Sequence, residues 1–260
     1  MEVQALLKRI DEMRSWIGSR RPLAPREVKE LDAYFRIGMT YTSNALEGNT
    51  LTLTETKVLL EDGLTAGGKP LRDSYEAIGH SKAYDFMLEA ARSDPFIFSE
   101  EVILQLHKLF FQGIEPEYAG IYRDIQVFIT GTEYMPPKPE DVPVQMAELV
   151  HELNEKWDNT HPIRLAAYAH RRLVDIHPFS DGNGRTARLL MNLILINRGY
   201  QIICIPPILR TEYINAIEKS RRTGNNNAFD IFIAECEIEA QKDFCRMFSI
   251  VPPKRDDMTR

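Results

Sequence analysis

The chain lacks the features that would point to a membrane, secreted or zinc-binding protein. It contains no apolar run of about 18 residues or more, and its first residues, MEVQALLKRIDEMRSW, lack the apolar core of a signal peptide. Its three cysteines form no CxxC pair, and its six histidines show no HxxxH or HExxH spacing. We therefore expect a cytoplasmic protein with reduced thiols and no contact with a membrane.

The chain also lacks an excess of positive charge. Its formal net charge is −6 at pH 7, so no basic field is available to hold a nucleic acid. The apolar fraction of 43% and the charged fraction of 27% are typical of a water-soluble globular protein. With 260 residues, the chain is long enough to bury one large core.

Helical periodicity dominates what the sequence does contain. Apolar residues recur at spacings of three and four, which predicts amphipathic helices and an all-α fold. The run Thr52–Glu55 has the spacing of a capping box, and Gly63 is placed to end the helix that it opens. Other helical stretches are expected around 6–17, 31–46, 99–113, 146–157, 165–176, 189–199, 211–221 and 228–248.

One stretch, IQVFITGTEYMPPK at 125–138, departs from this pattern. Strand-forming residues surround Gly131, and a Pro-Pro pair ends the run, so we expect a short β-hairpin here. An isolated hairpin is marginally stable in water. It should therefore pack on the helical body, where its free edge could receive an extended partner.

The segment DIHPFSDGNGRTAR at 175–188 gathers a histidine, an acid, a Gly-Asn-Gly turn and two arginines. One helix should end before Pro178, and a strongly apolar helix follows the turn. The turn therefore falls at a helix N-terminus, where unpaired N–H groups and the helix dipole favour an anion. Glycines at this place also let the backbone approach a ligand closely.

The side chains around this turn suit a polyphosphate. Arg185 and Arg188 share a helix face near the N-terminus, where two cations are unfavourable unless an anion binds. Asp181 could supply an oxygen ligand to Mg²⁺, and His177 titrates near neutrality, which suits a general base. The alternative is a plain helix–turn–helix with a surface acid and solvated arginines.

HPFSDGNGRTAR resembles the core motif of the Fic family, HPFx(D/E)GNGRxxR, and matches it at every specified position. AGIYRDIQVFITGTEYMPPKP at 119–139 is similar to the segment that leads into the family's β-hairpin flap. The resemblance implies a Fic fold, a helical bundle with a short hairpin flap, from about residue 70 to 248. Most members with this motif transfer AMP from ATP to a Ser, Thr or Tyr hydroxyl of a protein.

The resemblance also implies a role for each matching residue. His177 would deprotonate the target hydroxyl, and Asp181 would hold Mg²⁺ against the α- and β-phosphates. The hairpin at 126–135 would align the target protein. The residues implied at the nucleotide are Asp181, Gly182, Asn183 and Gly184, with Arg185 at the β-phosphate, Arg188 at the γ-phosphate, Ile129 and Thr130 on the hairpin, and Tyr213 near the adenine.

A second motif, SNALEG at 43–48, lies upstream. Gly48 is a signal for a helix end, so Glu47 should lie in the last turn, where the dipole disfavours a carboxylate unless a cation partners it. Taken alone, Glu47 could be an ordinary exposed acid. The run resembles the motif (S/T)xxxE(G/N) of class II Fic proteins, which have an N-terminal inhibitory helix. This implies an inhibitory segment with Ser43 and Gly48, in which Glu47 pairs with Arg188 and blocks the γ-phosphate position.

We therefore expect an N-terminal helical region, residues 1–70, with the inhibitory motif, and a Fic catalytic domain, residues 71–260. The expected function is a self-inhibited protein adenylyltransferase that uses ATP and Mg²⁺ and modifies a target protein. The alternatives are a Fic-like enzyme with another nucleotide, phosphotransfer or removal of AMP, and a non-catalytic regulatory module. The sequence names no target and leaves automodification and homo-oligomer formation open.

Overall fold

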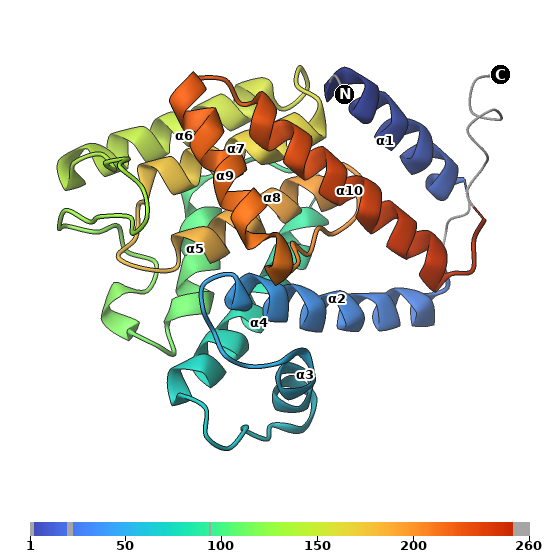
Figure 1. Ribbon diagram of the computed structural model, residues 1–260, viewed down its shortest axis with the longest axis horizontal. Coiled ribbons are helices and arrows are strands. Elements are labelled where there is room, and N and C mark those ends of the chain that lie inside the picture. The colour runs from blue at the N-terminus through green and yellow to red at the C-terminus, as the bar shows by residue number, and fades with distance from the viewer. Residues whose placement is uncertain (1–2, 20–22, 94, 252–260) are drawn as a thin grey trace.

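The computed structural model describes residues 3–19, 23–93 and 95–251, which form a bundle of α-helices (Figure 1). The expected all-α class is confirmed. No helix in these ranges combines the length and apolar character needed to cross a membrane. The α-helices of the described ranges are α1 (Val3–Gly18), α2 (Pro25–Ala45), α3 (Leu53–Asp62), α4 (Leu71–Ala91), α5 (Glu100–Phe111), α6 (Val142–Lys156), α7 (Pro162–Ile176), α8 (Asn183–Asn197), α9 (Arg210–Thr223) and α10 (Asn227–Met247), with short 3-10 turns η1 (Pro116–Tyr118), η2 (Pro139–Asp141) and η3 (Pro207–Leu209).

Helix α8 lies at the centre of the bundle. It packs along α7 and α4, and α5 and α2 also contact it. From Leu189 to Leu195 its apolar side chains are fully buried. A helix that is apolar on all sides is stable only when neighbours surround it. The N-terminus of α8, where an anion was expected, is therefore held firmly in place.

The N-terminal helices belong to the same core as the rest of the chain. Leu6, Leu7 and Ile10 of α1 are buried, and α1 lies against α10 (Figure 1). Helix α2 crosses α4, so that the segment carrying the second motif ends close to the start of α8.

The predicted cap of α3 is confirmed in detail. The Glu55 backbone N–H donates to Thr52 Oγ1 at 3.2 Å, and the Thr52 N–H donates to the Glu55 carboxylate at 2.7 Å. Gly63 ends the helix in the left-handed region, with φ at 70°. Local chemistry thus determines this helix at both ends.

The segment 125–138 differs from the sequence-based expectation, because it contains no β-strand within the described part of the chain. Its two arms turn back at Gly131, with φ at 85°. Side chains rather than backbone pairs hold the arms together: Gln126 Nε2 donates to the Pro136 carbonyl at 3.2 Å. Pro136 and Pro137 have no N–H to give to a ladder, which explains why the predicted pairing is absent. We call 125–138 the flap segment.

Candidate active site

The loop 177–182 between α7 and α8 begins with His177 in a strained backbone conformation. His177 has φ at 51°, in the left-handed region that residues with a Cβ rarely adopt. The Arg123 guanidinium holds this turn, because its Nε donates to the His177 carbonyl at 2.8 Å. Strain of this kind persists only where the surroundings fix it, and it concentrates at functional sites.

The His177 ring is in the neutral form that a general base needs, but its pKa differs from the near-neutral value expected from the sequence. Burial lowers its pKa to about 4, and the charges of Arg123 and Arg221 act in the same direction. The imidazole is therefore neutral near pH 7. Its Nδ1 lies 3.3 Å from the Val174 carbonyl. With the ring proton directed at that carbonyl, Nε2 is the atom that can accept a proton.

The rest of the loop is fixed by side chains that face away from the expected ligand. Asn183 Nδ2 and Oδ1 bond the Phe179 carbonyl and N–H at 2.8 and 2.9 Å. Phe179 stacks on His107 with 3.7 Å between ring centroids. His107 accepts from the Gly120 N–H and donates to the Asp181 carbonyl. The Asn183 side chain thus supports the loop, and only its backbone N–H can serve an anion site.

At the start of α8, two glycines leave room that any side chain would fill. Gly182 has φ at 79°, and a Cβ there would lie 2.8 Å from the Phe110 ring. A Cβ on Gly184 would lie 2.2 Å from Oε1 of Glu47. The Glu47 carboxylate therefore rests on the first turn of α8, where the sequence predicted an anion.

Glu47 reaches this position from a turn and not from a helix. Helix α2 ends at Ala45, so Glu47 lies beyond the last helical turn in which it was expected. Gly48 has φ at 94°, which lets the chain reverse direction at this point. The corrected position places the carboxylate at the positive end of α8, where Arg188 Nη2 lies between it and the Ser43 carbonyl of α2.

Arg188 is the buried cation beneath Glu47. Its side chain is 3% exposed, and Nη2 lies 2.7 Å from Glu47 Oε1. The Ser43 hydroxyl and carbonyl accept from Arg188 at 2.9 and 2.8 Å, and the Tyr213 hydroxyl accepts at 3.2 Å. His170 Nε2 lies 2.9 Å from that hydroxyl. The chain's own groups thus satisfy this guanidinium on every side.

The charge balance of this pair favours the ionised state. Burial acts to raise the pKa of Glu47, but the charges of Arg188 and Arg185 and the hydrogen bond from Arg188 outweigh it, so the pKa is lowered. A carboxyl with a lowered pKa gives up this pairing only as the pH falls below its ordinary range. The Glu47–Arg188 pair is therefore intact at neutral pH.

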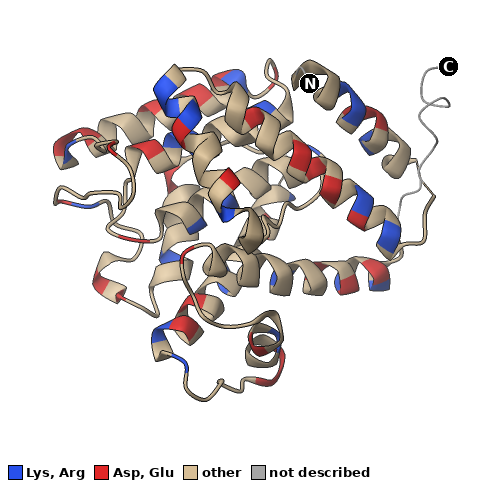
Figure 2. Ribbon diagram, in the orientation of Figure 1, with Lys and Arg blue, Asp and Glu red and all other residues tan. Residues whose placement is uncertain are grey.

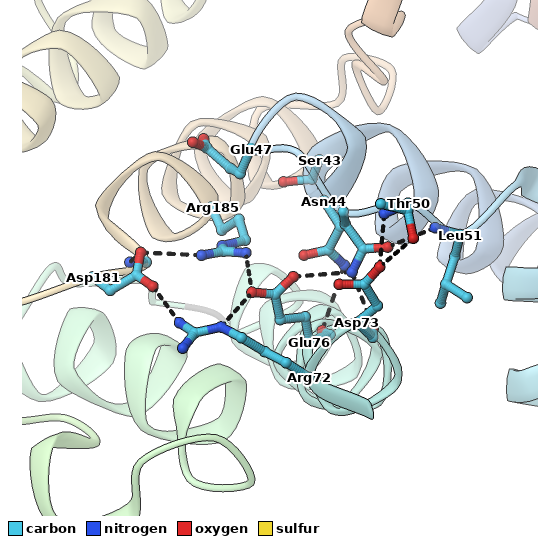
Figure 3. Close-up of polar contacts among 12 residues, drawn as sticks. Ser43, Asn44, Glu47, Thr50, Leu51, Arg72, Asp73, Glu76, Asp181 and Arg185 are labelled. Atoms are coloured by element: carbon cyan, nitrogen blue, oxygen red, sulfur yellow. Dashed lines mark hydrogen bonds and ion pairs between the residues drawn. The ribbon is translucent and has the colours of Figure 1, made fainter. Parts of the chain in front are cut away.

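Asp181 and Arg185 belong to a second polar cluster on the opposite side of the α8 N-terminus (Figure 3). Asp181 accepts from the Gly182 N–H at 2.6 Å, from Arg185 at 3.2 Å and from Arg72 at 2.6 Å. Arg185 also pairs with Glu76 at 3.1 Å and lies over the Phe110 ring. Each arginine of the motif therefore has a carboxylate partner from a distant segment, which resolves the repulsion expected at a helix N-terminus.

Comparison with known proteins shows what this chain is similar to. The Fic/DOC family profile matches residues 97–195. A relative from Drosophila mojavensis, named protein adenylyltransferase Fic, is 37% identical over 206 residues, covering 79% of this chain and 40% of the relative. One of the same name from Nematostella vectensis is 36% identical, covering 90% of this chain and 54% of the relative. The chain thus spans about half the length of the curated relatives it matches.

Solved structures agree with the sequence matches. Fic-1 (amino acids 134–508) from C. elegans superimposes with a TM-score of 0.86 at 30% identity, covering 95% of this chain and 73% of that chain. The chain belongs to the Fic/DOC family. A Fic-domain-containing signaling protein from Bacteroides thetaiotaomicron has a TM-score of 0.84 at 28% identity, covering 95% of this chain and all of that one.

In this Fic protein the structure brings His177, Asp181, Arg185, Arg188 and Glu47 around the start of α8. Three other expected residues lie outside this group. Ile129 and Thr130 are on the flap segment, and in the described part of the chain no hydrogen bond joins them to 177–188. Tyr213 is 4% exposed and lies behind Arg188.

Sequence reasoning missed three residues that shape the Fic site: Arg72, Glu76 and Arg123. Arg72 and Glu76 are four apart on α4 and bond each other at 3.2 Å, a spacing visible in the sequence. Their contacts with Asp181 and Arg185 join segments more than a hundred residues apart, which no local pattern reveals. Arg123 binds three backbone carbonyls, and no sequence signal marks such a partner.

Proposed function

We propose that this chain is a self-inhibited protein adenylyltransferase that moves AMP from ATP to a hydroxyl of a target protein. The position of the Glu47 carboxylate carries this proposal, since it occupies the α8 N-terminus and Arg188, two groups suited to phosphate. Relatives named protein adenylyltransferase Fic support the same reaction. In this proposal residues 1–70 carry the inhibitory motif and residues 71–260 form the catalytic domain.

In the proposed reaction the target hydroxyl oxygen attacks the α-phosphorus of ATP. The bond from that phosphorus to the bridging oxygen breaks, and pyrophosphate leaves with the electron pair. The hydroxyl proton passes to His177 Nε2. The first-turn N–H groups of α8, together with Arg185 and Arg188, stabilise the charge on the phosphates. Tyr213 contributes through Arg188, which its hydroxyl holds at 3.2 Å.

Asp181 is the residue that would hold Mg²⁺. Its side chain is 45% exposed at the mouth of the site. Magnesium in nucleotide sites takes one or two carboxylates and completes its shell with phosphate oxygens and water, so a single carboxylate fits. Arg72, which donates to Asp181 Oδ2 at 2.6 Å, would release that oxygen. When bound, the ion would supply neutralisation of phosphate charge.

The flap segment is the proposed docking place of the target protein. Residues 126–135 leave their backbone groups outside any ladder in the described part of the chain, so an extended target segment can pair with them. Arg123 connects the flap segment to the base, since it binds the carbonyls of Ile125, Pro137 and His177. In this proposal Ile129 and Thr130 approach the nucleotide when the target is bound.

The proposal is tested with two forms of ATP, one labelled at the α-phosphate and one at the γ-phosphate. The Glu47→Gly variant is incubated with each form, Mg²⁺ and a cell lysate. AMP transfer places the α-label on protein and leaves the γ-label in pyrophosphate. Transfer of the γ-label would show a kinase-type reaction and contradict the proposal. Absence of both labels from protein would also contradict it.

The His177 imidazole is expected to stay neutral well below the ordinary histidine range. Its pKa is lowered to about 4, so the basic form persists as the pH falls through 6.5. Stability that depends on the neutral ring is lost only as the pH falls from about 6.5 towards 4, because the unfolded chain takes up the proton first. An NMR titration of the ring, assigned with His177→Ala, measures this directly. A midpoint near 6.5 would contradict the structure.

Replacement of Arg123 by alanine is expected to lower kcat by roughly 10- to 100-fold, because the base and the flap segment lose their common support. Three carbonyls would lose a charged donor. The KM for ATP should change little, since Arg123 does not reach the α8 N-terminus. Arg123→Lys should not restore the rate, since an ammonium lacks the planar fork.

The matched control for Arg123→Ala is Arg222→Ala on α9, an exposed arginine that the structure leaves without an ion pair among the described residues. Both variants are compared by steady-state kinetics and thermal unfolding. Equal kcat values for the two variants would rule out the positioning role of Arg123.

A further inference from the structure

A groove between α2 and α10 is not used by the proposed reaction. It has a volume of about 500 Å³ and also includes part of the segment 202–209. Its lining is rich in bulky apolar side chains, among them Tyr34, Phe35, Tyr41, Ile202, Phe232 and Met247. We call it the α2–α10 groove.

Apolar side chains at the rim of the groove remain in solvent. Tyr34 is 59% exposed, Leu53 49% and Met247 39%. Single exposed apolar residues are ordinary, but a group of them around a hollow marks a binding surface. Three separate helices, α2, α3 and α10, contribute these side chains. The groove is therefore suited to an occupant with an apolar face.

The polar rim of the groove carries charge of one sign. Glu212, Glu235, Glu239 and Asp243 line it, and none of its lining residues is Lys or Arg. Three of these acids recur every fourth residue along α10, so they form a stripe on one face of the helix. Figure 2 shows acidic residues in red along α10, with Lys and Arg residues in blue on the same helix. Eight residues of helix span about 12 Å, which sets the length of the stripe.

The acids of the rim differ in how far the chain neutralises them. Glu239 pairs with Lys242 at 2.6 Å, and Asp243 pairs with Arg246. Among the described residues, no hydrogen bond or ion pair reaches the side chains of Glu212 and Glu235. Glu235 on the stripe and Glu212 beside it on α9 thus keep negative charge next to the apolar surface.

We propose that the α2–α10 groove binds a basic amphipathic helix of a partner protein. The apolar residues of that helix fill the groove, and its Lys or Arg residues, spaced by one turn, lie along the acidic stripe. A small organic cation would engage one carboxylate and leave the periodic stripe unused. Nucleic acids and anionic membranes are repelled by the same carboxylates.

The groove adjoins the inhibitory contact. Thr42 lines the groove, and the next residue, Ser43, binds Arg188 through its hydroxyl and carbonyl. Leu209 also lines it, and the neighbouring Arg210 donates to the Leu46 carbonyl at 2.8 Å. A bound helix therefore touches both elements that hold the turn of Glu47. A regulatory effect of the bound helix rests on the proposed function, whereas the binding of that helix to the groove does not.

The test uses two synthetic peptides of about 15 residues with leucines at helical spacing. One has lysines along its flanks, and the other has glutamates at the same places. Each carries a fluorophore, and binding to the full chain is followed by fluorescence anisotropy without ATP. The protein variants are Glu235→Lys/Glu239→Lys in the groove and Glu148→Lys/Glu155→Lys on α6, which make the same change in net charge.

The lysine peptide is expected to bind the unmodified chain saturably and to bind the groove variant at least about tenfold more weakly. The glutamate peptide should prefer the groove variant, and the α6 variant should behave as the unmodified chain. The Tyr34→Ala/Leu53→Ala variant should also bind the lysine peptide more weakly. Circular dichroism confirms that each variant is folded.

The proposal is overturned by absence of saturable binding, by equal binding of the two peptides, or by equally weakened binding of the lysine peptide to the α6 variant. Because ATP is absent, failure here is separate from failure of the proposed reaction.

Discussion

Glu47→Gly is expected to raise the rate of AMP transfer by roughly 10- to 100-fold, since a hydrogen bond to a charged group contributes about 1.5–3 kcal/mol. In the resting chain the Glu47 carboxylate lies 2.7 Å from Arg188 and covers Gly184. Its removal frees a cation and the first-turn N–H groups of α8 for phosphate. Arg188 keeps its bonds to Ser43 and Tyr213, so it stays in position. The measurement is the initial rate of transfer of the α-label from ATP to protein.

One further variant separates the effect of charge from the effect of side-chain size, and a second variant serves as a control. Glu47→Gln keeps the size of the side chain and removes its charge, so its rate should fall between those of the unmodified chain and Glu47→Gly. Glu61→Ala on α3 is the control, because Glu61 is exposed and pairs with Lys57 across 3.8 Å. It should leave the rate unchanged. A Glu47→Gly variant that is folded but no faster than the control would contradict self-inhibition.

The parts of the site that the sequence predicts are those that depend on local chemistry. The Gly-Asn-Gly turn falls at the start of α8, because Pro178 disfavours a helix before it and an apolar run follows it. The capping box of α3 forms as expected, because its two partners are three residues apart. The contact between Glu47 and Arg188, by contrast, is predicted by the resemblance to a family motif and not by periodicity.

The parts that the sequence does not predict depend on distant partners. Strand-forming residues in the flap segment favour an extended backbone, but they do not say whether a partner strand is present. The opposing arm carries Pro136 and Pro137, which cannot donate to a ladder. Likewise no local pattern names the distant partners of Arg72 and Arg123. Arg72 reaches Asp181 because α4 packs against α8, and Arg123 reaches the His177 carbonyl from 54 residues away in the sequence.

Removal of the base is expected to have the largest negative effect. In the Glu47→Gly background, His177→Ala should lower the rate of AMP transfer by about 10²- to 10⁴-fold, which is the usual contribution of a positioned general base. His177 lies at the C-terminus of α7, and the phosphate-binding groups belong to α8, so ATP should bind with nearly unchanged affinity. The comparison of transfer rate with ATP affinity, measured by calorimetry, therefore distinguishes loss of chemistry from loss of binding.

The matched control for this variant is His151→Ala on α6, whose exposed ring pairs with Glu155 at 3.3 Å. It should retain the full rate in the same background. His177 is half-buried beside Val174 and held through Arg123, so the alanine variant is also compared by thermal unfolding. A folded double variant that keeps its rate within about threefold of Glu47→Gly would show that another group takes the proton, because a general base contributes far more than this. A double variant that loses ATP binding together with the rate would instead place His177 among the groups that hold the nucleotide.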